Sequence, residues 1–133
     1  MKKSRILIGL LLITALLLAM VGCGQNTAGE TSQPAAEGNS FTLTVVFADG
    51  SEKEFSYTTT TEYLGEFLQQ EGLLEGYMGP YGLYIESVAG ESAIYEETGT
   101  YWAFYEGDAY AAQGIDLTPI ADGAHYQLVN TKG

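Results

Sequence analysis

The hydrophobic and polar positions divide the chain into three stretches. An apolar run extends from Ile6 to Val21, and residues 24–40 contain no aromatic residue and no aliphatic residue larger than Ala. From Phe41 onward, apolar positions alternate with polar ones or recur at helical spacing. Because a chain needs such spacing to bury one face of a strand or helix, residues 41–133 are predicted to fold, and residues 24–40 to form a flexible tether.

Alternation predicts a β-hairpin at the start of the folded part. Apolar and polar residues alternate through 41–47, and a second alternating run places Phe55 and Tyr57 between polar neighbours. Asp49 and Gly50, which lie between the two runs, form a common hairpin turn. The sequence therefore predicts a strand, a turn and a second strand.

A single helix is predicted after the hairpin. Apolar residues recur at helical spacing there, at Tyr63, Leu64, Phe67 and Leu68. Thr59 followed by Glu62 fits a capping box at the start, and Gly72 ends the segment. Gly65 inside the helix costs about 1 kcal/mol relative to Ala, which indicates either close packing against a neighbouring strand or a weak helix.

Three aromatic-rich segments predict further strands. They span residues 81–88, 101–105 and 126–129, and a turn-rich linker at 76–80 precedes the first of them. A hairpin, one helix and further strands form an α+β order. A small β-grasp-like domain, in which a mixed sheet packs on one helix, accommodates that order in a chain of this length.

The N-terminal segment has the pattern of a secretory signal. Three cations, Lys2, Lys3 and Arg5, precede the apolar run, and Gly22 and the only cysteine, Cys23, follow it. This arrangement resembles the signal of bacterial lipoproteins. A membrane-spanning helix is the alternative, but it needs about 20 apolar residues, and this run is shorter.

The lipoprotein resemblance implies a division of the chain. Residues 1–22 would be the signal peptide, residues 23–40 the lipidated cysteine and its tether, and residues 41–133 the folded domain. Acylation of Cys23 would anchor the protein to the cell membrane on its outer side and leave no thiol for a disulfide or a catalytic role. The resemblance therefore predicts an extracytoplasmic location.

The charge of the chain limits its partners. The formal net charge is −12, and removal of residues 1–22 takes away three cations and no acidic residue, which gives −15. Lys53 and Lys132 are the cations that remain. Such an acidic surface repels nucleic acid and anionic lipid headgroups, which excludes nucleic acid as a partner. The simplest role of the charge is to keep the protein soluble.

The residues that could carry catalysis or a metal are few. The chain has one histidine, His125, no cysteine besides Cys23, and no serine motif of the nucleophile-elbow type, so we expect no enzymatic activity. His125 follows a turn and needs no special role, although a neutral imidazole could ligate cobalt. The acidic residues Asp49, Asp108, Asp116 and Asp122 do not have the spacing of a calcium loop, so they are predicted to be solvated turn residues. We therefore expect no metal site and no cofactor apart from the lipid.

A set of short motifs suggests a family. In chain order they are Gly79-Pro80-Tyr81, Ser87-Val88-x-Gly90, Tyr101-Trp102, Gln113-Gly114-Ile115 and Asp122-Gly123. This ordered set resembles the C-terminal β-domain of transcobalamin and intrinsic factor, and the related domain of Gram-positive surface lipoproteins. The resemblance covers nearly all of residues 41–133. It implies a β-grasp-like fold, a corrinoid such as cobalamin as candidate ligand, and a role as an accessory to a transporter.

The same resemblance predicts where a ligand would bind. It places the ligand-facing edge at Tyr101, Trp102, Tyr105, Tyr110 and Gln113. Aromatic rings with polar tips suit a flat apolar macrocycle edged with amides. Trp102 shares one face of an alternating strand with Phe104, however, as a core residue would. The carriers also use a separate helical barrel domain that is not recognised in this sequence, so a second protein or a second copy would have to supply the other face.

Two hypotheses of different class follow. In the first, the protein is a lipid-anchored lipoprotein that binds a small molecule, which predicts a concave aromatic groove beside Tyr105 and Gln113. In the second, it is a surface module that binds another protein, for example by strand addition at an open sheet edge, which predicts a flat exposed edge or patch.

Overall fold

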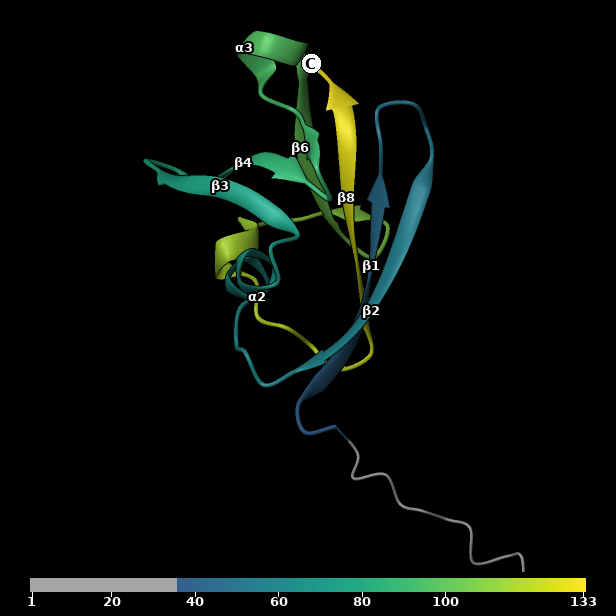
Figure 1. Ribbon diagram of the computed structural model, residues 1–133. Coiled ribbons are helices and arrows are strands. Elements are labelled where there is room, and N and C mark those ends of the chain that lie inside the picture. Colours follow the sequence, from purple (N-terminus) through teal and green to yellow (C-terminus); the bar gives the residue numbers. More distant parts are fainter. Residues whose placement is uncertain (1–35) are drawn as a thin grey trace, which may run out of the picture. The chain divides into compact units, whose positions relative to one another are not determined.

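Strands form about half of residues 36–133, the part of the chain that the computed structural model describes (Figure 1). The strands are β1 (Asn39–Val46), β2 (Glu52–Thr59), β3 (Leu74–Gly79), β4 (Gly82–Val88), β5 (Glu91–Ser92), β6 (Thr100–Glu106), β7 (Ala109–Tyr110) and β8 (Ala124–Lys132). The helical segments are α2 (Leu64–Gln70), α3 (Tyr95–Thr98) and the 3₁₀ turn η1 (Ile115–Leu117). The predicted signal peptide, Cys23 and most of the predicted tether lie outside the described residues.

The strands form two sheets. A five-stranded sheet has the order β2-β1-β8-β6-β7, and a three-stranded sheet has the order β3-β4-β5. In the larger sheet β1 pairs antiparallel with β2 and parallel with β8, and β6 pairs antiparallel with β8. This mixed sheet packs on α2, so the predicted α+β class with a β-grasp-like arrangement is confirmed.

The predicted first hairpin is formed by β1 and β2. Leu43 pairs with Phe55, and the core-facing residues Phe41, Leu43 and Val45 are buried while the residues between them are partly exposed. Strand β1 starts at Asn39, two residues before the predicted boundary of the domain. The alternation in the sequence therefore identifies which side chains of β1 face the core, as expected for a sheet with one buried face.

Helix α2 covers the core face of the larger sheet. Its residue Phe67 packs edge-on against Phe41 and Tyr57, with ring centroids 5.6 and 5.0 Å apart. The predicted capping box is wrong, because Tyr63 occupies the N-cap position and no side chain caps the helix. Thr59 is still part of β2, and its hydroxyl accepts a hydrogen bond from Thr61 N at 3.1 Å instead.

The predicted linker at residues 76–80 is also wrong, because β3 continues through Gly79. The turn itself is shorter and consists of Pro80 and Tyr81, between the paired residues Gly79 and Gly82. A methyl group at Gly76 would overlap the carbonyl oxygen of Tyr84 on β4. The glycine therefore permits a close approach of two strands, which in the sequence alone looks like a turn.

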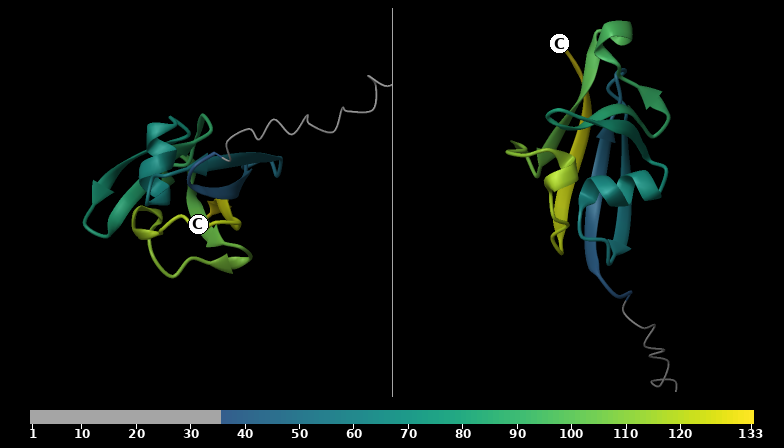
Figure 2. Two further views of the ribbon diagram at one scale, coloured as in Figure 1. Left: turned by 90° about the horizontal axis from the view of Figure 1, so that it is seen from below. Right: turned by 90° about the vertical axis from the view of Figure 1, so that its left-hand side faces the viewer.

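The smaller sheet and α2 lie on the same side of the larger sheet (Figure 1 and Figure 2). The C-terminus lies beside α3, where Gly133 N donates to Gly99 O at 3.2 Å. Within residues 36–133, no helix has the length and apolar character needed to span a membrane.

Candidate functional site

A groove of about 400 Å³ lies where the two sheets meet. One wall is formed by residues 83–85 of β4, and the other by Tyr101, Trp102 and Phe104 of β6. Residues 110–115, which connect β7 to η1, form the rim. The walls are mostly aromatic and aliphatic, as in many small-molecule sites.

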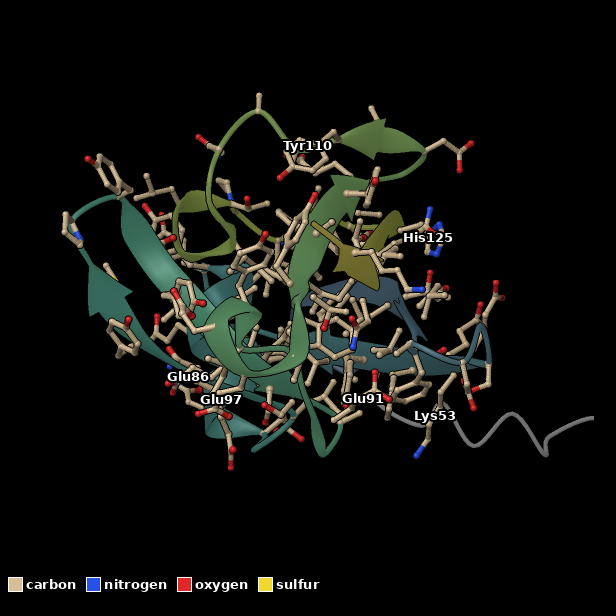
Figure 3. The ribbon with its side chains drawn as sticks, turned by 90° about the horizontal axis from the view of Figure 1, so that it is seen from above. Lys53, Glu86, Glu91, Glu97, Tyr110 and His125 are labelled. Carbon is tan, nitrogen blue, oxygen red and sulfur yellow. The ribbon has the colours of Figure 1, made fainter. Side chains whose placement is uncertain are left out.

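The structure brings four of the five predicted site residues to this groove. Tyr101, Trp102, Tyr110 and Gln113 line it. Tyr105 does not line it, but its ring packs edge-on against Tyr110 with the centroids 5.4 Å apart, because the two residues pair directly across β6 and β7. Tyr110 is 65% exposed and stands beside β6 (Figure 3). Tyr105 thus supports the rim and does not form the wall.

Trp102 belongs to the core as well as to the groove. Successive residues of β6 face opposite sides of the sheet, so Trp102 and Phe104 point toward the core while Tyr101 and Tyr105 do not. Only 6% of Trp102 is exposed. Its indole Nε1 is buried and has no hydrogen-bond partner among the described residues. An unpaired buried donor costs about 1–3 kcal/mol, so this N–H is a group that a ligand or a water molecule would satisfy.

Asp116 connects the rim of the groove to the β4 wall. Its Oδ1 accepts a hydrogen bond from Leu83 N at 3.1 Å, which connects η1 to β4. Nearby, Gln113 Nε2 donates to Leu117 O at 2.8 Å, so the amide nitrogen is engaged within the rim. Asp116 is half-buried, and the prediction of a solvated turn residue is wrong for it.

Sequence reasoning missed the β4 wall. The sequence did contain one indication of this wall: residues 76–85 are uncharged and rich in aromatic residues, although the chain is strongly acidic. The same hairpin also carries exposed aromatic residues. Tyr81 at its turn is fully exposed, and Tyr77 packs against Tyr84 with ring centroids 5.3 Å apart. The molecule thus has both the groove that the first hypothesis predicts and the exposed patch that the second predicts.

A comparison with solved structures shows the family. A protein from Ruminococcus gnavus ATCC 29149, described as a candidate metal-binding protein, is 34% identical with a TM-score of 0.67, and the match covers 71% of this chain and 98% of that protein. The chain belongs to the family of this Ruminococcus gnavus protein. No family model and no curated protein matches the sequence.

A second solved structure shares the fold of this Ruminococcus gnavus family. It is haptocorrin in complex with Cbi, with a TM-score of 0.52 and 15% identity. The match covers 71% of this chain and 25% of haptocorrin, so the chain corresponds to about a quarter of that protein. At this identity the likeness shows a common fold, which agrees with the resemblance to the cobalamin carriers.

The Ruminococcus gnavus protein is described as a candidate metal-binding protein, so the positions of possible metal ligands in this chain are relevant. In residues 36–133, no three or more His, Cys, Asp or Glu side chains are grouped so that they could hold a metal ion. His125 Nε2 lies 2.9 Å from Thr44 Oγ1 and is well separated from Tyr110 (Figure 3). Asp49 accepts hydrogen bonds from the Ser51 hydroxyl and backbone N–H, which lower the pKa of its carboxyl below 3.8. It is a turn residue, as predicted.

Proposed function

We propose that the protein is an extracytoplasmic lipoprotein, anchored to the cell membrane through Cys23, that binds a corrinoid or a similar flat ligand in the groove between β4 and β6. It would act as a binding accessory to a transporter on a Gram-positive surface, and not as an enzyme. The observation that carries the proposal is that Tyr101, Trp102, Tyr110 and Gln113 gather around one groove. The fold shared with haptocorrin, solved in complex with Cbi, supports the same ligand class.

The size of the groove implies a half-site. Its volume of about 400 Å³ is near the lower end of ligand pockets, which range from about 300 to 1,000 Å³. A flat macrocycle could place one edge or face against Tyr110 and Gln113 and leave the other exposed. A second protein, or a second copy of the chain, would then cover that face.

A titration tests ligand binding. A soluble form that begins at Gly24 retains the whole described core and is titrated with cobalamin and cobinamide, followed by calorimetry and the corrin absorbance band. We expect micromolar or tighter binding that Tyr110→Ala weakens about tenfold, since an aromatic contact contributes about 0.5–1.5 kcal/mol. Tyr95→Ala is the matched control, because Tyr95 is also exposed, at 52%, but does not line the groove. No binding up to millimolar corrinoid would contradict the proposal.

A separate experiment tests the anchor. Cys23→Ala in the full chain removes the only thiol. We expect the wild-type protein in the membrane fraction with a lipid-modified N-terminal cysteine by mass spectrometry, and the variant unprocessed and without lipid. An unmodified cysteine in the wild-type protein would rule out lipidation at Cys23.

The alternative function is a surface module that binds another protein. The exposed aromatic residues of the β3–β4 hairpin favour it, because tyrosine is enriched at protein interfaces. Tyr81→Ala would weaken the binding of such a partner protein and leave corrinoid binding unchanged, so the two functions can be separated.

A further inference from the structure

One edge of β6 is open over part of its length. Strand β6 pairs with β8 along its whole length, but with β7 only at Tyr105 and Glu106. Next to that short pairing, Ala111 N donates to Phe104 O at 3.0 Å, so the backbone groups of Phe104 point away from β8. Alternate residues of an antiparallel strand direct their backbone groups to the same side, so the N–H and C=O of Trp102 also point away from β8.

The backbone groups of Trp102 have no partner within residues 36–133. No hydrogen bond joins them to another backbone group or side chain, whereas Thr100, the next outward-facing residue, is engaged by the hydroxyl of Thr98. Trp102 lines the groove. An unpaired N–H and C=O at the edge of a strand form a template for pairing with another chain. The edge of β6 at Trp102 is therefore a candidate site for an added strand.

The opposite wall of the groove is a second strand edge. Strand β4 pairs with β3 on one side and with β5 only at Ser87 and Val88. The backbone N–H of Leu83 donates to Asp116, so the backbone groups of Leu83 point away from β3. By alternation, the backbone groups of Ile85 point the same way, toward the groove. Strands β4 and β6 cross at a large angle (Figure 1). One added strand could therefore pair along only one of them, and β6 is that strand because Asp116 occupies Leu83 N.

The charges define the partner. Of the 17 Asp and Glu residues only Glu30 lies outside residues 36–133, whereas of the 5 Lys and Arg residues only Lys53 and Lys132 lie within them. Two of the acids, Glu106 at the end of β6 and Asp108 in the β6–β7 turn, lie just beyond one end of the open edge. A basic segment is the complementary occupant.

We propose that the groove binds an extended, basic peptide segment of a partner protein by strand addition to the open edge of β6 at Trp102. The segment would continue the line of β7 along β6, and its alternate side chains would enter the groove and contact Leu83 and Ile85. Thr98 engages the backbone groups of Thr100, and Ala111 N engages Phe104 O, so the free edge spans residues 101–103. At a rise of about 3.3 Å per residue, it accommodates about three residues. Backbone bonds would supply affinity, and the groove would select side chains.

This inference rests on backbone geometry and charge, and it is independent of the corrinoid proposal. The two proposed ligands would compete for one groove. A failed peptide titration therefore leaves the result of the corrinoid titration unaffected, and the reverse also holds.

The test uses an acetylated and amidated eight-residue peptide of alternating Lys and Val, added to the ¹⁵N-labelled soluble form that begins at Gly24. We expect submillimolar binding, with the largest amide shifts and slowed hydrogen exchange at Trp102 and Phe104. A copy of the peptide N-methylated at its four central amides keeps the charge but loses the backbone donors. It should bind at least tenfold more weakly, and an alternating Glu and Val peptide should not bind.

Two variants locate the site. Ala112→Trp fills the groove from an exposed rim residue and should weaken the Lys-Val peptide at least tenfold, whereas Ala48→Trp, exposed at the β1–β2 turn, should have no effect. Equal binding of the N-methylated copy, no effect of Ala112→Trp, or shifts confined to the open edge of β2 (Glu52–Thr59) would each overturn the proposal. So would no binding of the Lys-Val peptide up to millimolar concentration.

Discussion

Replacing Gly65 with Ala should destabilise the protein although the substitution lies in a helix. A methyl group at Gly65 would lie 3.0 Å from Cα and N of Asp116 and 3.1 Å from the carbonyl carbon of Ile115. These are backbone atoms of η1, and η1 is fixed from several sides: Ile115 is 2% exposed, and Thr118 O accepts from Leu64 N at 3.0 Å. The contact cannot be relieved by rotation of a side chain.

The size of the effect follows from two opposing contributions. Alanine gains about 1 kcal/mol over glycine in helix propensity, while overpacking of a fixed site costs about 1–3 kcal/mol. Since the clash is with backbone, we expect a value near the upper end of that cost and a net loss of about 1–2 kcal/mol. In a domain of 60–100 residues each kcal/mol lowers Tm by about 4–8 °C.

Urea denaturation and calorimetry of the soluble form measure this loss. Gln69→Ala in the same helix is the control, because Gln69 is exposed and the change should stay within about 0.5 kcal/mol of wild type. A Gly65→Ala protein that is more stable than wild type by about 1 kcal/mol would refute the reasoning. It would show that η1 can move away at little cost.

Three further predictions concern the core and the groove. Asp116→Ala leaves the N–H of Leu83 unpaired and should cost about 1–3 kcal/mol in urea unfolding, whereas Asp108→Ala, an exposed turn carboxylate, should cost little. Leu43→Ala, at a residue with no exposed surface, should cost about 2–5 kcal/mol in the same assay, and a smaller loss would mean that the site collapses around the cavity. Burial, reinforced by Glu71, raises the pKa of Tyr57 above 10.0, so the folded state holds this proton more tightly and stability should fall as pH rises above about 10. Tyr57→Phe should reduce that fall in urea midpoints between about pH 9 and 11, and an unchanged pH profile would contradict the assignment.

Local patterns predicted the elements that bury one face. The alternation at Phe41, Leu43 and Val45 and the helical spacing at Phe67 each correspond to observed contacts with the core. One error arose because a residue type can serve two purposes. Gly76 looks like part of a turn, but it permits the close approach of β3 to β4, and that approach depends on a partner strand that no local pattern contains.

The candidate site could be predicted only on one side. The order of motifs pointed to the β6 edge and to Gln113, which are within about a dozen residues of each other in the chain. The β4 wall comes from a different sheet, and its position depends on the bond between Asp116 and Leu83. Sequence reasoning had no means of pairing these two residues, because nothing local distinguishes Asp116 from a solvated turn carboxylate.

The packing of η1 connects the core to the groove. On one side its backbone touches Gly65 of α2, and on the other Asp116 holds Leu83 of β4. A methyl group at Gly65 would displace η1 and therefore move the β4 wall of the groove. It would not contact any of the β6 residues that line the groove. If the groove binds its ligand as proposed, Gly65→Ala should weaken binding as well as stability, whereas Leu43→Ala should lower stability alone at temperatures where the variant is folded. Equal loss of affinity in both variants would indicate a general softening of the domain and would argue against a specific path through η1.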